Sequence, residues 1–380
     1  MNKVLFENTK NIDLVVVIPT LNEEQSIKKI ILDTKSALSE FPDSWKLVVS
    51  DNGSTDKTLK ILNEFSDILV NEIKEKGYGQ NLIGSFKSIN SEFIIFYDAD
   101  GSYDPKNILP MYKQIKDNNL DLVYLNRLKK QEKNAMPFIN KYFGTPILTS
   151  LINTFYKGNI TDCNSGMRIF RNDKIKKIQF ISKGMEFASE LFIEGLNNKL
   201  KIDQHISVFK KDTRTQAPHL NRWKDGWRHL KIILSFLPLR VLNIILCLIL
   251  FNYCLSFTLT FKTTVSGFPR IHSIILLLSI NIFLQILCLI IFNNRLKFKE
   301  KFSDLEKFNL YIQMYKRSYF IISSAIMISI FILLNIYLII SWVKSEEFFL
   351  NLEIILRIIM FANITSFLIH LEMIMDDNTL

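Results

Sequence analysis

The chain has 380 residues, enough for one sizeable soluble domain and a further region. It carries 47 lysines and arginines against 37 aspartates and glutamates, and this net charge of +10 would suggest nucleic acid as the partner of a soluble protein. However, three uncharged apolar runs of membrane-spanning length occur late in the chain, at about 241–261, 271–292 and 318–343. A membrane explains the excess of basic residues better, so we predict no nucleic-acid partner.

A fourth apolar run, at about 352–375, is less uniform than the other three. It contains Glu353, Arg357 and Glu372, so a helix lying on the membrane surface is the alternative to a fourth span. Its uncharged centre, 358–371, favours a span. We therefore predict a cytoplasmic domain at 1–235, ending in an interfacial segment, and an all-α transmembrane domain of four helices at 236–380.

Basic residues are distributed unevenly around the apolar runs. Few lie in the two short loops on one side of the membrane, namely Lys262, Arg270 and Lys344. Many precede the first run or separate the second from the third: Arg222, Lys224, Arg228, Lys231, Arg295, Lys297, Lys299, Lys301, Lys307, Lys316 and Arg317. The positive-inside rule then places the large domain and the C-terminus in the cytoplasm, as in a multi-pass protein of the cell (inner) membrane. The polar residues 1–13 do not resemble a signal peptide, and the four cysteines lack metal-ligand spacing.

The first 200 or so residues alternate short apolar runs with helical patterns. The apolar runs predict strands at 14–18, 46–50, 68–70, 93–97 and 121–125. Helical spacing is found at 27–38, 58–65, 82–86 and 185–197. This alternation, with polar motifs after successive strands, predicts a doubly wound α/β domain whose site lies at the carboxyl ends of its strands.

The end of the first strand carries two local signals. We expect the strand to stop at Pro19, which has no N–H group to donate to a sheet. Thr20 is followed by Glu23 three residues later, which matches a capping box and predicts that a helix begins there.

The twelve residues 93–104, FIIFYDADGSYD, are where we predict the chemistry. A buried strand is followed by Asp98 and Asp100, with the small Ala99 between them, so both carboxylates can share a hard divalent cation. Mg²⁺ usually keeps substrate phosphates in its shell, so an Asp-x-Asp at a strand end suggests a metal-bound diphosphate. A chance occurrence of this short pattern is the alternative, and its position after a buried strand argues against it.

Other polar motifs follow the remaining strands. A turn at 51–54 ends the second strand, and the two glycines of Gly77-Tyr78-Gly79 suggest either close approach to a ligand or an ordinary turn. Arg127 follows the fifth strand, and the polar loop 162–168 ends in Arg168, a residue suited to gripping phosphate. The predicted helix at 185–197 carries Glu186 and Glu190 one turn apart, and a solvated face explains them as well as catalysis does.

Two segments are expected at the membrane interface. Residues 136–156 are apolar and aromatic. The basic stretch that begins at Lys210 and Lys211 and continues through 214–231 also contains Trp223 and Trp227, residues that favour the interface. These basic residues serve either to set topology or to bind the phosphate of a lipid.

Together these motifs resemble the family-2 glycosyltransferases, and within them the membrane-anchored polyprenyl-phosphate glycosyltransferases related to dolichol-phosphate mannose and glucose synthases. The resemblance covers nearly the whole chain and continues into the four apolar runs. It is carried by the segments VVVIPTLNEE at 15–24, DNGSTD at 51–56, GYG at 77–79, DADGSYD at 98–104, SGMR at 165–168 and DGWRHL at 225–230.

The resemblance implies a glycosyltransferase-A fold, a Rossmann-like α/β domain with a mostly parallel sheet. It implies that Mg²⁺ or Mn²⁺ is held by Asp98 and Asp100, and that the catalytic residues are Asp98, Asp100, Arg127 and Arg168. The implied nucleotide-sugar contacts are Pro19, Thr20, Asn22, Glu23, Asp51, Asn52, Gly77, Tyr78 and Asp98. The candidates for binding the acceptor phosphate are Arg127, Arg168, Arg214 and Arg228.

The function implied is transfer of a hexose from a nucleotide-diphosphate sugar to a polyprenyl phosphate, dolichyl or undecaprenyl, with inversion. A glycosyltransferase or polysaccharide synthase with a sugar acceptor is the alternative, although no Gln-x-x-Arg-Trp motif is present. A non-enzymatic lipid-sugar transporter would be expected to have lost its metal ligands, whereas both aspartates remain. Assembly into a homo-oligomer is left open.

The chain departs from the family pattern in two places. Leu125 stands where the resemblance leads us to expect glycine, and Gln204-His205-Ile206 replaces a usual Glu-x-Pro. These departures leave the core motifs intact and concern the acceptor side of the site.

Overall fold

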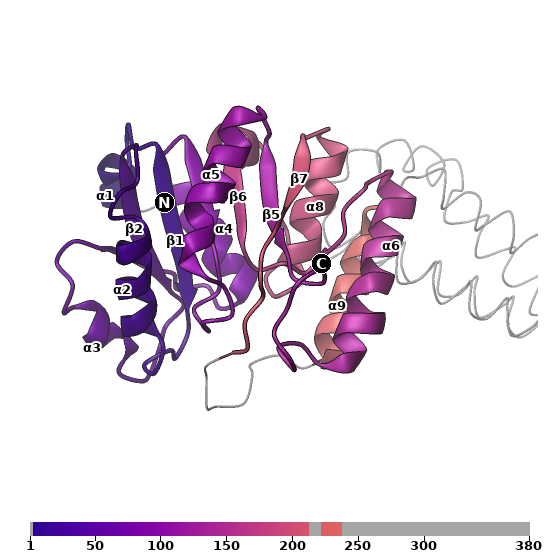
Figure 1. Ribbon diagram of the computed structural model, residues 1–380, viewed down its shortest axis with the longest axis horizontal. Coiled ribbons are helices and arrows are strands. Elements are labelled where there is room, and N and C mark those ends of the chain that lie inside the picture. Colours follow the sequence, from indigo (N-terminus) through magenta and orange to yellow (C-terminus); the bar gives the residue numbers. More distant parts are fainter. Residues whose placement is uncertain (1–2, 213–221, 238–380) are drawn as a thin grey trace, which may run out of the picture. The chain divides into compact units, whose positions relative to one another are not determined.

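The structure is a computed structural model that describes residues 3–212 and 222–237 (Figure 1). The chain divides into two compact units, Met1–Ile233 and Leu234–Leu380. The four predicted spans and Arg214 lie outside the described residues. Among the residues that are described, no helix is long and apolar enough to cross a membrane. The transmembrane domain and the domain boundary at 235 therefore stay predictions.

The first unit is built on a seven-stranded sheet in the order β3-β2-β1-β4-β6-β5-β7. β6 is antiparallel to both of its neighbours, β4 and β5, and every other neighbouring pair is parallel. The predicted Rossmann-like α/β domain with a mostly parallel sheet is thereby confirmed. The strands are β1 Leu14–Thr20, β2 Trp45–Asp51, β3 Leu69–Glu72, β4 Phe93–Phe96, β5 Leu122–Asn126, β6 Arg168–Arg171 and β7 Ile202–Ile206.

Helices cover both faces of this sheet (Figure 1). Ile31 of α2 and Ile115 of α5 share one buried cluster with Ile95 of β4. On the opposite face, the ring of Phe86 in α4 lies 5.7 Å from that of Phe96 in β4. The helices are α1 Lys3–Asn8, α2 Ile27–Ala37, α3 Thr58–Leu62, α4 Tyr78–Ser88, α5 Ile108–Asp117, α6 Thr145–Tyr156, α7 Asn172–Ile175, α8 Phe187–Asn197 and α9 Arg222–Ser235, with a 3₁₀ turn η1 at Pro105–Asn107 and a π-helical turn η2 at Asn140–Gly144.

The central strands are continuous apolar runs because the sheet is covered on both sides. Every residue of β1 and β4 is buried, so neither strand has a solvent face that would require polar residues. β7 lies at one end of the strand order and has no fully buried residue. Its sequence, IDQHI, has polar residues at its three central positions. The core therefore lies around β1 and β4, which places the turn after β4 in the middle of the sheet.

The first strand does not stop at Pro19, contrary to the sequence-based expectation. β1 continues to Thr20, and Pro19 lies opposite Ser50 of β2. On its other side, β1 pairs with β4 only as far as Val17 and Phe96. Peptide groups alternate in direction along a strand, so the nitrogen of Pro19 faces the side where β4 has already ended. The missing N–H group therefore costs no sheet hydrogen bond.

The predicted capping box is wrong. α2 begins only at Ile27, after the N-cap Ser26, whose side chain makes no cap hydrogen bond. The Thr20 hydroxyl instead donates to the carbonyl of Ser50 at 3.2 Å, and the Glu23 carboxylate accepts from the Ser26 hydroxyl at 2.8 Å. Both side chains thus organise a loop at the end of the strand, and this loop separates β1 from α2.

The direction of β6 was not predicted from the sequence, where residues 162–168 were expected to be a loop only. Arg168, the first residue of β6, pairs with Phe96, the last residue of β4. Because β6 runs opposite to the other strands, the loop that precedes it lies at the edge where the other strands end. The 162–167 loop therefore joins the loops that follow β1, β2 and β4.

Candidate active site at the carboxyl edge of the sheet

Asp98 and Asp100 lie in the turn after β4, as predicted. The hydroxyl of Tyr78, the first residue of α4, donates a hydrogen bond of 2.8 Å to Asp98 Oδ1. The N–H of Ser102 donates to Asp100 Oδ1 at 2.9 Å, and Gly101 has the positive φ of 79° that this tight turn requires. Both aspartates are partly exposed, so a ligand can reach this turn.

Tyr78 acts as a hydrogen-bond donor in this arrangement. Burial of its phenol and then the neighbouring Asp98 carboxylate raise the pKa of Tyr78 well above its ordinary value. The hydroxyl therefore keeps its proton throughout the physiological pH range. The hydroxyl of Tyr78 is directed to the acidic motif. The contact of Tyr78 with the nucleotide sugar, which the sequence suggested, stays a prediction.

The two aspartates are a suitable but incomplete donor set for Mg²⁺ or Mn²⁺. Such hard cations take about six oxygen ligands, and Mg²⁺ usually completes its shell with water and substrate phosphates. Within 3–212 and 222–237, no three His, Cys, Asp or Glu side chains gather in a way that could hold a metal ion by themselves. The donors therefore fit a cation whose shell is completed by a diphosphate, as the sequence predicts.

The two glycines around Tyr78 are required by the chain's own backbone. A Cβ atom at Gly77 would lie 2.1 Å from the carbonyl oxygen of Lys183, and one at Gly79 would lie 2.6 Å from that of Ser182. Gly77 also has φ 128°, a conformation that residues with a side chain rarely adopt. In this structure the two glycines make a close approach to residues 182–184 of the chain itself, and the close approach to a ligand stays a prediction.

The predicted nucleotide contacts Asp51 and Asn52 hold the loops of this edge together. The wholly buried Asp51 accepts hydrogen bonds from the N–H groups of Gly53 and Ser54, at 2.8 and 2.9 Å. Asn52 Oδ1 accepts from the N–H of Gly77 at 2.8 Å, which ties the loop after β2 to the start of α4. A contact with nucleotide stays a prediction for both residues.

The loop after β1 is tied to the loop after β2. Asn22 has φ 56° and accepts from the N–H of Thr55 at 2.8 Å, while its own N–H donates to the Ser54 hydroxyl at 2.9 Å. The N–H of Glu23 donates to the Thr58 hydroxyl at 2.9 Å. The structure therefore brings the predicted donor-binding residues of these two loops into one cross-linked edge.

Arg127 follows β5 and forms a two-bond ion pair with Asp162. Its Nε and Nη2 each donate to a different carboxylate oxygen at 2.8 Å, and its side chain is 14% exposed. Burial tends to lower the pKa of Arg127, but the Asp162 carboxylate outweighs it and raises that pKa overall. Arg127 thus stays charged and partly accessible, although Asp162 compensates its charge.

Arg168 is wholly buried, contrary to its predicted role as a phosphate ligand. Its guanidinium donates to the carbonyl oxygens of Ser165, Ala188 and Cys163 at 2.9, 2.7 and 3.0 Å. It also lies over the ring of Phe192, 4.2 Å from the ring centre. Burial lowers the pKa of Arg168 to about 10. In this structure Arg168 joins the 163–165 loop to α8 and exposes no atom to a phosphate.

The remaining basic candidates differ in position. Arg228, on α9, is 40% exposed and lies 3.4 Å from Asp225, while Arg214 lies outside the described residues.

Lys210, expected at the membrane, is instead found at the acidic turn. Its Nζ lies 2.8 Å from Asp104, and its N–H donates to the carbonyl of Ser102. The sequence could have indicated Lys210 through its place just after the last strand, where the other polar motifs also stand.

Glu186, the N-cap of α8, and Glu190, within α8, do not lie on a solvated face. Glu190 is wholly buried and accepts hydrogen bonds from the N–H groups of Ile181 and Ser182 at 2.9 and 2.8 Å. Glu186 accepts from the N–H of Gly184 at 3.0 Å. Both carboxylates therefore hold the 181–184 segment, which packs against the glycines on either side of Tyr78.

A buried histidine joins α8 to α9. Nδ1 of His229 lies 2.8 Å from the hydroxyl oxygen of Ser189. Burial, followed by the positive charges of Arg168 and Arg127, lowers the pKa of His229 to about 3. His229 is therefore neutral in the folded protein at physiological pH.

Comparisons with known proteins agree with these motifs. A family model described as Glycosyl transferase family 2 matches residues 15–179, which include the acidic motif and the loop before β6. Low-salt glycan biosynthesis hexosyltransferase Agl6 of Haloferax volcanii is 33% identical over 226 residues, covering 59% of this chain and 54% of that protein. The match thus spans about half the length of that relative.

Two further relatives are matched over most of their length. UDP-N-acetylglucosamine–dolichyl-phosphate N-acetylglucosaminyltransferase of Methanococcus voltae is 27% identical over 217 residues, covering 50% of this chain and 83% of that protein. The uncharacterized protein MJ0544 of Methanocaldococcus jannaschii is 30% identical over 193 residues, covering 47% of this chain and 80% of that protein. All three matches are long enough to include a complete α/β domain.

Proposed function

This chain belongs to glycosyltransferase family 2, and from that premise we propose that it transfers a hexose from a nucleotide-diphosphate sugar to a polyprenyl phosphate at the cytoplasmic face of the membrane. The observation that carries the proposal is the pair Asp98 and Asp100 in the turn after a central strand, with Tyr78 bound to the first of them. Several relatives are named for transfer to dolichyl or undecaprenyl phosphate, which supports a lipid phosphate as acceptor.

The residues of this edge suit such a transfer. Asp98 and Asp100 would hold Mg²⁺ or Mn²⁺, which when bound stabilises the negative charge that develops on the departing nucleotide diphosphate. A lipid phosphate is already an anion at neutral pH, so it can attack the anomeric carbon without a strong general base. Arg127, together with Arg228 and Arg214, would bind that phosphate, and inversion at the anomeric carbon follows from direct attack.

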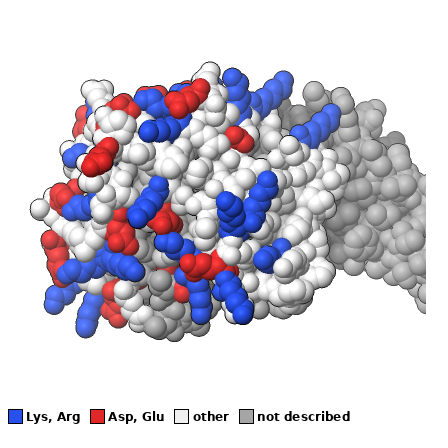
Figure 2. Space-filling view, viewed as in Figure 1, with Lys and Arg blue, Asp and Glu red and all other residues white. Residues whose placement is uncertain are grey.

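An exposed aromatic surface supports a location at the membrane. Phe138, Ile139, Tyr142, Phe143 and Ile147, around η2 and the start of α6, are each more than half exposed. In Figure 2 the surface over α6 carries few charged side chains, and those in view are basic. Apolar and aromatic side chains accompanied by basic ones are the composition of a surface that lies in the headgroup region of a bilayer.

The proposal is tested by incubating membranes that contain the protein with a panel of radiolabelled UDP- and GDP-sugars and polyprenyl phosphate. We expect one donor to yield a labelled lipid that is sensitive to mild acid, as sugar phosphates are. Label that appears in an oligosaccharide or polysaccharide instead would favour a sugar acceptor. No labelled product with any donor would contradict the proposal.

A further inference from the structure

We propose that Tyr78 and Gly166 together set the orientation of the Asp98 carboxylate, so that Tyr78 is a positioning residue for the acidic motif and Gly166 is its steric complement. This inference rests on the proposed function only in taking Asp98 as a ligand of a divalent cation. The GYG and SGMR segments are about 90 residues apart in the sequence, and on this proposal both orient the Asp98 carboxylate.

The first observation is the hydrogen bond from Tyr78 to Asp98 Oδ1, at 2.8 Å. A carboxylate on a short side chain has two rotatable bonds, and a donor bound to one of its oxygens restricts both. A hydrogen bond to a charged acceptor is also stronger than one between neutral groups. With Oδ1 held by Tyr78, the direction of Oδ2 is defined.

The second observation is the contact between Asp98 and Gly166 on the other side of the carboxylate. A Cβ atom at Gly166 would lie 2.0 Å from Asp98 Oδ2, a separation that two non-bonded atoms cannot have. Gly166 is itself held, because its N–H donates to the hydroxyl oxygen of Tyr103 at 2.6 Å. The Asp98 carboxylate therefore occupies the space that any side chain at position 166 would need.

The third observation is that Tyr78 is anchored from behind. Gly77 and Gly79 lie so close to the carbonyls of Lys183 and Ser182 that neither can carry a Cβ atom without displacement. The N–H of Gln80 also donates to the Lys183 carbonyl, at 3.2 Å. The start of α4 thus has little freedom to move, and this holds the Tyr78 hydroxyl within hydrogen-bond distance of Asp98 Oδ1.

These contacts explain why two carboxylates are enough. A cation site with few protein ligands depends on those ligands being oriented before the metal arrives, since partners behind the ligands commonly change metal affinity by about tenfold to a hundredfold. Removing the Tyr78 hydroxyl removes the restraint that it places on Asp98 Oδ1. It should therefore weaken cation binding by about tenfold while leaving the fold intact.

The test measures Mn²⁺ binding to the full-length protein in detergent, by the electron paramagnetic resonance signal of free Mn²⁺, with UDP or GDP present in parallel. Tyr78→Phe should weaken Mn²⁺ binding by about tenfold, and Gly166→Ala by at least as much. In an Asp98→Asn background, Tyr78→Phe should have no further effect, because its only proposed route is through Asp98.

The matched controls lose similar groups elsewhere. Tyr112→Phe removes a tyrosine hydroxyl that donates to Asp43, and Gly226→Ala adds a methyl group where no atom lies within 4 Å. Both should bind Mn²⁺ as the unaltered protein does. Unchanged Mn²⁺ affinity in Tyr78→Phe, or a full further loss when it is added to Asp98→Asn, would overturn the proposal. These outcomes do not depend on lipid transfer, which the radiolabel assay tests separately.

Discussion

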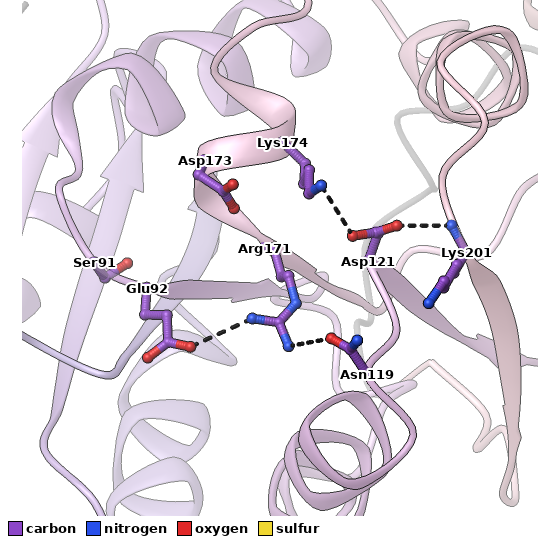
Figure 3. A pocket seen from close by; sticks show the side chains of 8 residues that line it. All are labelled: Ser91, Glu92, Asn119, Asp121, Arg171, Asp173, Lys174 and Lys201. Atoms are coloured by element: carbon purple, nitrogen blue, oxygen red, sulfur yellow. Dashed lines mark hydrogen bonds and ion pairs between the residues drawn. The ribbon is translucent and has the colours of Figure 1, made fainter.

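The two edges of the sheet are both rich in charged side chains, but they use them differently. The amino edge contains a hollow of about 480 Å³, a size within the range of ligand pockets, lined by Ser91, Glu92, Asn119, Asp121, Arg171, Asp173, Lys174 and Lys201 (Figure 3). The carboxyl edge contains the acidic motif and the loops after β1, β2 and β4. The family motifs lie at the carboxyl edge and not at this hollow.

In the hollow, four of the six charged side chains lie in two pairs of opposite charge. Arg171 lies 3.4 Å from Glu92, and Lys174 lies 3.8 Å from Asp121, as Figure 3 shows. Three basic and three acidic residues line it, so it has no excess charge with which to attract a diphosphate. Partly exposed pairs of this kind contribute about 0–1 kcal/mol each. We therefore interpret the hollow as a hydrated surface feature.

At the carboxyl edge, polar side chains bind the main chain of neighbouring loops. Asp51, Asn52 and Asn22 each accept hydrogen bonds from backbone N–H groups of a loop, which makes the edge rigid. Asp98 accepts a hydrogen bond from the hydroxyl of Tyr78, the first residue of α4. The comparison teaches that polar groups held by the backbone, more than empty volume, support the proposal that the chemistry lies at the carboxyl edge.

The largest expected effect separates the two edges directly. Asp98→Asn or Asp100→Asn should reduce transfer by at least about a hundredfold, because each removes an anionic ligand from the cation. Glu92→Gln, the matched loss of one negative charge in the hollow, should leave transfer unchanged. Transfer to polyprenyl phosphate is measured with radiolabelled donor, and circular dichroism confirms folding. Full activity of the unaltered protein in excess chelator would contradict the metal role.

The second effect tests the packing behind Tyr78. Gly77→Ala should lower transfer by about tenfold and stability by about 2 kcal/mol, because the new methyl group meets the Lys183 carbonyl and the backbone has φ 128°. Gly144→Ala is the control, since the nearest atom to its Cβ position is 3.7 Å away. Thermal unfolding and transfer are measured for both variants. Equal behaviour of the two would show that the 77–79 turn is not constrained.

The third effect concerns the acceptor. If Arg228 or Arg214 binds the lipid phosphate, replacing it with alanine should raise the apparent KM for polyprenyl phosphate by about tenfold and leave that of the donor nearly unchanged. Lysine should restore binding only in part, because it lacks the planar fork of arginine. Arg171→Ala in the hollow is the matched control. Unchanged acceptor kinetics in both alanine variants would assign these arginines to membrane topology alone.

The fourth effect is a pH dependence from the α8–α9 contact. His229 stays neutral in the folded protein down to about pH 3, whereas in the unfolded chain it takes a proton near its ordinary value of 6.5. Its contribution to stability is therefore fully present above pH 6.5 and declines as the pH falls, by about 1.4 kcal/mol per pH unit.

Thermal or chemical unfolding from about pH 7.5 to about pH 5.5 checks this expectation. The unaltered protein should lose about 1.4 kcal/mol more than His229→Asn over this interval, because the variant has no proton to take up at that position. The exposed charges of the hollow are present in both proteins and cancel in the difference. Parallel curves for the two proteins would contradict a buried neutral histidine.

The smallest effect is expected in the hollow itself. Lys174→Ala removes one partly exposed partner of Asp121, 3.8 Å away, and should change stability by less than about 0.5 kcal/mol and transfer by less than about twofold. The measurements are thermal unfolding and the radiolabel assay. A tenfold loss of transfer would mean that the hollow takes part in function and that the contrast between the two edges is wrong.

Much of the fold could be predicted because the strands are continuous apolar runs. β1, β2, β4 and β5 lie within one or two residues of their predicted positions, since burial on both faces favours apolar residues at their central positions. The acidic motif was placed at the end of a buried strand for the same reason. The Pro19 signal failed because its nitrogen faces the side where β4 has already ended, so the missing N–H group costs no sheet hydrogen bond. The Thr20 signal failed because its hydroxyl donates to the carbonyl of Ser50 and does not cap a helix.

The sequence by itself determined the α/β alternation, the family motifs and the position of Asp98 and Asp100 after a central strand, because these follow from periodicity and local order along the chain. The tertiary structure decided which residues meet. Only the reversed direction of β6 brings Gly166 against Asp98. Only the packing of residues 182–184 on Gly77 and Gly79 places the Tyr78 hydroxyl beside Asp98. These contacts join segments far apart in the sequence, and no local sequence pattern shows which distant segments will meet. Burial of Arg168 has the same cause, since an arginine that binds carbonyls and one that binds phosphate look alike in a sequence.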